Sequence, residues 1–273
     1  MAKITVPKLQ EMKKKGEKIA MVTAYDYSFA RLLDAAGAEI LLVGDSLGMV
    51  IQGRPNTLGV TLDHMIYHTQ CVASGAREAH VVCDLPFLSY QASEEDAIRS
   101  CGLALKKGHA EAVKLEGGEE MVKTVRTLTS MGIPVMGHVG LMPQRVQQMG
   151  GYKIQGKGKE AAKKVLKDAK AVAAAGAYAL VLEGIPAELA ETITKSVSIP
   201  TIGIGSGPYC DGQVLVIYDL LGMYPDFSPK FVKKYAELGT TIGDAVKRYV
   251  EEVKSGKFPS ERESFSDSSG RRQ

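Results

Sequence analysis

Seven ionisable side chains stand at the ends of short apolar runs in the sequence. In chain order they are Asp26, Asp45, Asp84, Glu116, His138, Glu183 and Asp219, and Ser46 directly follows the second of them. Any one of them could be an ordinary helix cap or turn residue placed just after a strand. If the runs are neighbouring parallel strands, however, the side chains converge, and clustered carboxylates repel one another unless a cation or a proton compensates them. Convergence of the whole set therefore favours a functional site.

Three of these residues suggest a magnesium site. Asp45, Asp84 and Glu116 offer hard oxygen ligands, no His-x-x-x-His pair stands near them, and strand alternation turns the neighbouring Cys83 away. Such a set suits Mg²⁺ far better than zinc, with waters or substrate oxygens in the remaining positions. Mg²⁺ on the carboxylate and carbonyl of a 2-keto acid is a Lewis acid for enolate formation. The predicted reaction class is proton abstraction next to a carbonyl, with a carboxylate such as Glu183 as the base.

Lys114 lies two residues before Glu116, so both side chains point to the same face of their strand. A lysine that faces a packed interior has a desolvation cost unless anions meet it. Two interpretations remain open at this point. Lys114 either receives the carboxylate of a substrate or forms an ion pair with Glu116. By the same alternation, His138 and Glu183 also face the interior.

The elements that must position these side chains follow from the apolar pattern. Eight runs of strand length are followed by segments with helical periodicity. The runs cover residues 19–26, 39–45, 80–84, 110–116, 134–138, 178–183, 200–204 and 213–219. Strands that are apolar on both faces and separated by helices indicate a parallel sheet with right-handed crossovers. Eight such units favour a closed (β/α)₈ TIM barrel, an α/β fold whose active site forms at the carboxyl ends of the strands.

We expect one catalytic domain over residues 1–256, because no interior stretch has the composition of a linker. Within it, residues 7–15 are expected to form a short helix that closes the bottom of the barrel. The loop at 143–158 is long for a connection of this kind and is a candidate active-site lid. Residues 257–273 are polar and are expected to form a disordered tail.

Length and charge argue against several classes of partner. The 273 residues carry 34 basic and 31 acidic side chains, so the formal net charge is only 34 − 31 = +3. Nucleic-acid and membrane-surface proteins normally show a strong basic surplus. The longest nearly apolar run, 171–182, is too short to span a bilayer. The four cysteines show neither a Cys-x-x-Cys pair nor regular spacing, so we expect reduced thiols and a cytoplasmic location.

Motifs at the predicted strand ends carry a family resemblance. In one-letter code they are TAYD at 23–26, VGDSLG at 43–48, CDLPF at 83–87, VKLEG at 113–117, GHVGL at 137–141, GGYK at 150–153, LEG at 182–184, IGIGSG at 202–207 and YDLLG at 218–222. Together they resemble those of the ketopantoate hydroxymethyltransferase family. The likeness runs from about residue 5 to about residue 256. So many separate motifs are far more specific than a single fingerprint.

The resemblance implies an enzyme of pantothenate and coenzyme A biosynthesis. Members of that family transfer a hydroxymethyl group from 5,10-methylenetetrahydrofolate to 3-methyl-2-oxobutanoate, which gives 2-dehydropantoate. By similarity, Asp45 and Asp84 would hold Mg²⁺, with Glu116 in or next to its coordination shell. The resemblance also implies a homo-oligomer, expected to be a decamer.

The same resemblance assigns the remaining site residues. Ser46 and Lys114 would bind the keto acid together with the two aspartates. Glu183 matches the family's proton acceptor. His138 matches a polar active-site residue that would support catalysis by hydrogen bonding to the substrate.

Two rival functions remain. A lyase or mutase of the Mg²⁺-dependent 2-keto-acid superfamily, similar to phosphoenolpyruvate mutase and isocitrate lyase, would share Asp45, Asp84 and the barrel. A nonenzymatic keto-acid-binding protein would share the pocket, although binding alone does not need a base at Glu183. Mg²⁺-dependent exchange of the C3 proton of 3-methyl-2-oxobutanoate would separate both rivals from the transferase.

Overall fold

The structure is a computed structural model that describes residues 2–224 and 229–266. The chain divides into two compact units, Met1–Ile217 and Tyr218–Gln273. The expected single domain over residues 1–256 does not coincide with this division, and it stays a prediction. In the part of the chain that the structure describes, no helix is long and apolar enough to cross a membrane.

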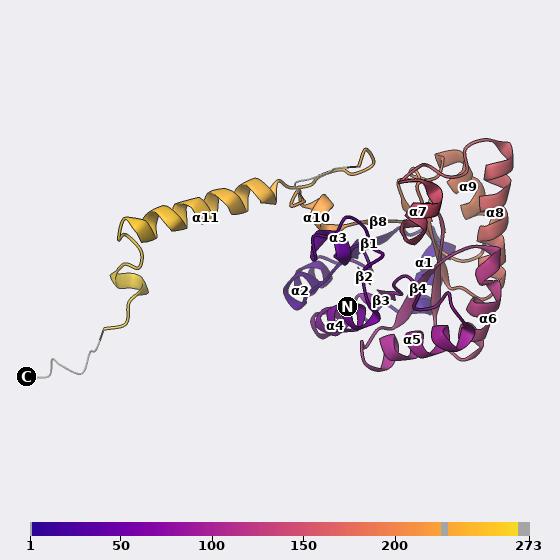
Figure 1. Cartoon of the computed structure of the whole chain (residues 1–273), viewed down its shortest axis with the longest axis horizontal. Helices are drawn as coiled ribbons and strands as arrows, with labels where there is room; N and C mark the ends of the chain where they lie inside the picture. The colour runs from indigo at the N-terminus through magenta and orange to yellow at the C-terminus, as the bar shows by residue number, and fades with distance from the viewer. Residues whose placement is uncertain (1, 225–228, 267–273) are drawn as a thin grey trace, which may run out of the picture. The chain divides into compact units, whose positions relative to one another are not determined.

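Eight parallel strands close into a barrel within the described residues of the first unit. They run in sequence order around the barrel, and β8 pairs back onto β1. The strands are β1 (Ile19–Thr23), β2 (Ile40–Val43), β3 (His80–Asp84), β4 (Ala112–Glu116), β5 (Val135–Gly140), β6 (Ala179–Glu183), β7 (Thr201–Ile204) and β8 (Gly212–Leu215). Figure 1 shows the helices arranged around these strands. The (β/α)₈ barrel predicted from the apolar runs is confirmed.

Helices fill the connections between the strands. They are α2 (Tyr27–Ala35), α3 (Leu47–Val50), α4 (Leu62–Gly75), α5 (Glu94–Lys106), α6 (Val122–Ser130), α7 (Val146–Met149), α8 (Lys159–Ala174) and α9 (Ala187–Ser196), with the 3₁₀ helices η1 (Glu119–Met121) and η2 (Pro143–Arg145). α5 begins where the sequence supplies a cap, since the Ser93 hydroxyl accepts a hydrogen bond from the Asp96 amide at 3.0 Å. Three acidic residues in its first turn favour the positive end of the helix dipole.

The helix α1 (Val6–Lys15) covers the end of the barrel where the strands begin. Its buried side chains Leu9 and Met12 belong to one apolar cluster with barrel residues such as Ile19, Ile40 and Tyr178. Pro7 fits the first turn of the helix, where no backbone donor is needed, and Gly16 ends it with a left-handed φ of 71°. The short N-terminal helix expected at 7–15 is therefore present.

Of the seven ionisable residues, Asp26 and Asp219 lie furthest beyond the ends of their strands. β1 ends at Thr23, and Asp26 instead caps α2 by accepting a hydrogen bond from the Phe29 amide at 2.9 Å. β8 ends at Leu215, and Asp219 lies in α10 (Ile217–Leu220). The predicted strands at 19–26 and 213–219 were too long, because an apolar run can continue past the last ladder hydrogen bond into the next helix.

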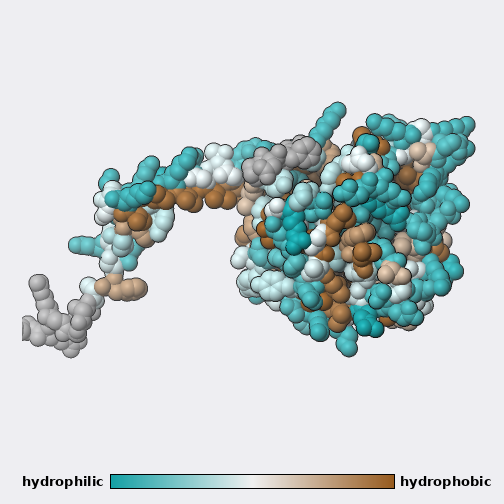
Figure 2. Space-filling model, viewed as in Figure 1, coloured by the Kyte–Doolittle hydropathy of each residue, from teal (hydrophilic) through white to brown (hydrophobic). Residues whose placement is uncertain are grey.

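The second unit contains α11 (Leu238–Lys254) and the 3₁₀ helix η3 (Glu261–Glu263). α11 has no buried residue among those described. Ile242, Val246, Tyr249 and Val253 recur at helical spacing and are between 45% and 54% exposed. Figure 2 shows the apolar stripe along this helix. Of the tail predicted to be disordered, 257–273, the structure describes residues 257–266, which include η3, and the rest lies outside the described residues.

Candidate active site

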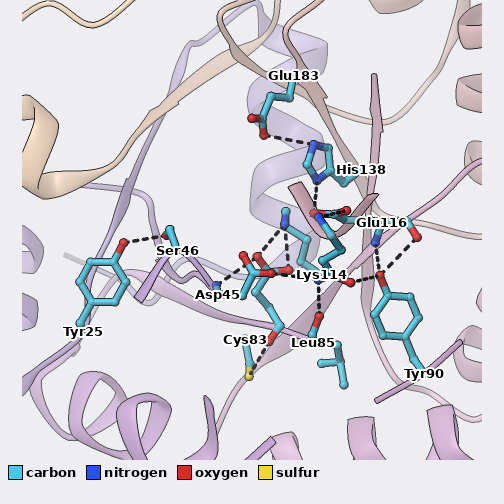
Figure 3. Close-up of polar contacts among 12 residues, drawn as sticks. Tyr25, Asp45, Ser46, Cys83, Leu85, Tyr90, Lys114, Glu116, His138 and Glu183 are labelled. Atoms are coloured by element: carbon cyan, nitrogen blue, oxygen red, sulfur yellow. Dashed lines mark hydrogen bonds and ion pairs between the residues drawn. The ribbon is translucent and has the colours of Figure 1, made fainter. Parts of the chain in front are cut away.

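Neighbouring strands bring the predicted site residues together at the carboxyl end of the barrel. Asp84 is the last residue of β3 and lies opposite Lys114 on β4, and Glu116 lies opposite His138 on β5. Asp45 follows β2 by two residues, and Glu183 ends β6. The exposed fractions are 4% for Asp45, 2% for Asp84, 5% for Lys114, 2% for Glu116 and 1% for His138. Figure 3 shows the labelled members of the cluster pointing toward one another.

Lys114 pairs with Asp84. Its Nζ lies 2.8 Å from Asp84 Oδ1 and 2.7 Å from Oδ2, and both side chains are buried. Burial by itself would lower the pKa of Lys114, but the neighbouring carboxylates, Asp84 first, outweigh it and raise the pKa above its usual value. Of the two interpretations of Lys114, the ion pair with Glu116 is not the one that forms here. Glu116 still contributes to the field around the ammonium group.

Asp45 lies next to this pair, and among the described residues it forms no ion pair. Its backbone amide donates to Asp84 Oδ2 at 3.5 Å, and the Asp84 charge acts on the Asp45 carboxylate. Burial, and then the negative charge of Asp84, raise the pKa of Asp45 to about 7. Its Oδ2 accepts a hydrogen bond from the Gln144 side chain at 3.1 Å. Asp45 is thus held near Asp84 although the two carboxylates repel each other.

His138 lies between two glutamates. Its Nε2 is 3.2 Å from Glu183 Oε2, and its Nδ1 is 3.6 Å from Glu116 Oε1. Burial, followed by the nearby Lys114 charge, lowers the pKa of His138, which favours the neutral imidazole with a single N–H. Burial likewise raises the pKa of Glu116 well above its ordinary value. Glu183 is the more accessible of the two glutamates, since its side chain is 17% exposed against 1% for Glu116.

In its fully ionised form, the cluster would carry more negative charge than its one cation balances. Asp45, Asp84 and Glu116 would give three negative charges against the one positive charge of Lys114, a net of −2. Among the described residues, no hydrogen-bond partner reaches the buried Glu116 Oε1. A divalent cation with hard oxygen ligands would correct both features, so the residues fit Mg²⁺. No three His, Cys, Asp or Glu side chains within 2–224 and 229–266 are grouped to hold a metal alone. Water or substrate oxygens would have to complete the shell.

Ser46 extends the site on the side of β1. It directly precedes α3, and its hydroxyl lies 2.8 Å from the Tyr25 hydroxyl. The His68 Nδ1 lies 2.6 Å from the Tyr25 carbonyl oxygen, which ties α4 to the same place. The expected role of Ser46 in binding the keto acid stays a prediction.

Sequence reasoning missed Tyr90 and Gln144. Both are buried, and the Tyr90 hydroxyl donates to Gln144 Oε1 at 2.8 Å and accepts from the Glu116 amide at 3.0 Å. Gln144 lies in η2, inside the loop expected to act as a lid. Neither residue belongs to a periodic pattern or to a charged motif. For Gln144, the length of the loop at 143–158 was the one signal that pointed toward its part of the chain, and for Tyr90 there was none.

Comparison with known proteins identifies the relatives of this barrel. The sequence pattern of the ketopantoate hydroxymethyltransferase family matches residues 3–261. The chain belongs to this family. Its relatives include a 3-methyl-2-oxobutanoate hydroxymethyltransferase of Pelobacter propionicus, 57% identical over 263 residues that cover 96% of this chain and 97% of the relative. The protein of the same name from Syntrophus aciditrophicus is also 57% identical, with the same coverage. The predicted family and its enzyme class, a hydroxymethyltransferase, are confirmed.

Solved structures of lower sequence identity share the fold. A phosphonopyruvate hydrolase in complex with oxalate and Mg²⁺ has a TM-score of 0.63 and 12% identity, and the match covers 96% of this chain and 93% of that one. A 2,3-dimethylmalate lyase, a member of the PEP mutase/isocitrate lyase superfamily, has a TM-score of 0.59 and 15% identity, with 98% and 93% covered. At such identities the likeness establishes the barrel fold and nothing about the reaction.

Proposed function

We propose that this protein transfers a hydroxymethyl group from 5,10-methylenetetrahydrofolate to 3-methyl-2-oxobutanoate, forming 2-dehydropantoate for pantothenate and coenzyme A biosynthesis. Family membership supports the acceptor, since the relatives carry its name. One observation of the site gives the strongest support to the proposal. A buried cluster of three carboxyl groups and one cation lies on the same barrel rim as Glu183, a partly accessible carboxylate 3.2 Å from His138.

Asp45 and Asp84 would hold Mg²⁺ in this proposal, with Glu116 in or next to its coordination shell. Two features support this assignment: the cluster has more buried carboxyl groups than cations, and no hydrogen-bond partner reaches Glu116 Oε1 among the described residues. When bound, the ion supplies Lewis-acid stabilisation of negative charge on the keto-acid oxygens. Mg²⁺ commonly takes one or two protein carboxylates and leaves its other positions to water and substrate, which agrees with the limited number of side-chain ligands.

The chain's own residues would then bind and deprotonate the keto acid. Lys114 and Ser46 offer an ammonium and a hydroxyl group to the substrate oxygens, together with the region of Asp45 and Asp84. Glu183 would accept the proton from C3, and His138 would keep that carboxylate oriented and hydrogen-bond the substrate. C3 then bonds to the methylene carbon of the folate, and both bonds from that carbon to the folate nitrogens break. Water supplies the hydroxyl oxygen, and the C3 proton together with the two water protons ends on the new hydroxyl group and on the two nitrogens of tetrahydrofolate.

Exchange of the C3 proton with solvent deuterium tests the first step. The wild-type protein should exchange this proton of 3-methyl-2-oxobutanoate when Mg²⁺ is present. Glu183→Gln should slow the exchange on the order of 10²–10⁴-fold, because it removes a general base. Glu188→Gln, the same change at an exposed position of α9, is the matched control and should exchange normally.

Folate-dependent formation of 2-dehydropantoate tests the second step. In the exchange experiment, two results would exclude Glu183 as the base. One is that the wild-type protein does not exchange the C3 proton, and the other is that Glu183→Gln exchanges it as fast as the wild type. Exchange without any folate-dependent product would favour the rival lyase or mutase. Binding of the keto acid with neither reaction would favour a nonenzymatic binding protein.

The proposal extends to the assembly and location of the protein. We infer a homo-oligomer, expected to be a decamer by family resemblance, that acts in the cytoplasm. The exposed apolar side chains of α11 support the assembly, because a helix face of this kind is usually covered by another surface. Four free cysteines, three of them buried, support a reducing compartment.

A further inference from the structure

Gln144 is a buried amide that joins the connection after β5 to the carboxylate cluster. Its side-chain Nε2 donates to Asp45 Oδ2 at 3.1 Å and to the Leu85 carbonyl at 2.8 Å. Its Oε1 accepts from the Tyr90 hydroxyl at 2.8 Å and from Gln91 Nε2 at 2.9 Å. Both N–H donors are therefore used, and the carbonyl oxygen accepts twice. Such a fully satisfied buried amide has one well-defined orientation.

The neighbours decide which end of the amide faces Asp45. The Tyr90 phenol carries a proton at neutral pH and donates it to Oε1 at 2.8 Å. The Leu85 carbonyl can only accept, so it requires Nε2. An amide turned by 180° would place its oxygen against this carbonyl and against the Asp45 carboxylate, both of them acceptors. Leaving buried groups unpaired in that way is costly.

Gln144 also reaches a second carboxylate through its main chain. Its backbone N–H donates to Glu116 Oε2 at 3.2 Å. Asp45 lies two residues beyond the end of β2, so the strand ladder does not fix its side chain. Asp45 and Glu116 come from β2 and β4, on either side of β3. One residue of the connection after β5 thus orients two carboxylates from different strands.

We propose that Gln144 is a positioning residue of the metal site. It holds Asp45 through its side chain and Glu116 through its backbone N–H, in the orientation that Mg²⁺ binding requires. The inference rests on the metal assignment made under the proposed function. Gln144 acts through its neighbours and contacts no reacting atom in that scheme. Outer-shell partners of this kind typically change metal affinity on the order of 10–100-fold when they are removed.

Mn²⁺ binding to the intact protein tests this role. Gln144→Met keeps the length of the side chain and the backbone N–H but removes both side-chain donors. The dissociation constant for Mn²⁺, followed by the spin-resonance signal of the free ion, should rise on the order of 10–100-fold. Gln147→Met makes the same change at an exposed position three residues further along the chain. It should bind Mn²⁺ within about twofold of wild type, as surface substitutions usually do.

Tyr90→Phe provides a second variant that changes less of the core. It removes the hydroxyl group that fixes Gln144 Oε1, so it should weaken Mn²⁺ binding in the same direction but by less. A merely structural role would lower the melting temperature and leave the dissociation constant of the folded protein unchanged. Unchanged Mn²⁺ affinity in both folded variants overturns the inference and leaves the proposed function standing. A wild-type protein that binds no Mn²⁺ overturns the metal assignment and this inference together.

Discussion

The buried pair of Lys114 and Asp84 should control the stability of the barrel rim, and Lys114→Met is the perturbation that tests this. The Lys114 Nζ lies 2.7 Å and 2.8 Å from the two Asp84 oxygens. At an effective dielectric constant of about 20, the attraction at this distance is about 6 kcal/mol. The desolvation of both charges offsets part of this attraction, and breaking a buried pair from one side typically costs about 3–5 kcal/mol. We therefore expect Lys114→Met to lower the free energy of unfolding by about that amount.

The two partners should not respond equally. Lys114→Met leaves Asp84 buried beside Asp45 and Glu116, with no cation in the cluster. After Asp84→Asn, Lys114 still has two neighbouring carboxylates, Glu116 and Asp45, which already help to raise its pKa. The substitution also removes the repulsion between the carboxylates of Asp84 and Asp45. Asp84→Asn should thus cost about 1 kcal/mol or less, in the range of a net hydrogen bond. In the double variant, Asp84→Asn should restore much of the stability lost in Lys114→Met.

Urea unfolding at pH 7.5 in the presence of EDTA measures these differences. Lys163→Met is the matched control, because Lys163 forms an exposed ion pair with Glu160 at 2.8 Å and should contribute less than about 1 kcal/mol. If Lys114→Met is as stable as this control, the buried pair does not have the stabilising role that its geometry implies. If the double variant loses the sum of the two single losses, the pairing between these two side chains is refuted.

Two further predictions concern pH and metal. His80 is 2% exposed, and burial lowers its pKa from 6.5 to about 4. The unfolded chain therefore takes up a proton below pH 6.5 that the folded chain accepts only near pH 4. At 1.36 kcal/mol per pKa unit, about 2–3 kcal/mol of stability present above pH 6.5 should be lost by about pH 4. Urea unfolding at pH 7.5 and 4.5 should show a smaller loss for His80→Gln than for wild type, and equal losses would contradict the assignment. Removal of divalent cations with EDTA should abolish 2-dehydropantoate formation, and added Mg²⁺ should restore it. Activity that survives complete metal removal would contradict the role of Asp45 and Asp84.

The fold could be predicted because each strand of a closed parallel barrel is apolar on both faces. The run at 80–84 coincides with β3, and the run at 110–116 contains β4. The strand limits could not be predicted where an apolar run spans two elements. The run at 213–219 covers most of β8 and most of α10, and nothing in its composition marks the break. Apolar spacing likewise cannot show what the exposed face of α11 packs against.

The charged residues of the site could be predicted from the sequence. The uncharged residues Gln144 and Tyr90, which hydrogen-bond to them, could not. Parallel strands bring their carboxyl ends to one rim, so Asp84, Glu116 and Glu183 had to converge once the barrel was inferred. Gln144 and Tyr90 enter the site from connections, where side-chain direction depends on the folded backbone and follows no period. A buried glutamine cannot be distinguished from a solvated one in the sequence. Its importance becomes visible only when its four hydrogen-bond partners are known.

The rim of this barrel contains ionisable residues that do not stabilise the fold. Burial and mutual repulsion raise the pKa of both Asp45 and Glu116, so the ionised cluster opposes folding. Apolar residues at those positions would pack into the barrel without that cost. The arrangement becomes favourable when a cation joins the cluster, because the same low-polarity surroundings that penalise unpaired carboxylates then strengthen their attraction to it. In the proposed function, the residues whose ionised forms oppose folding are thus the ones that would hold Mg²⁺ against the keto acid.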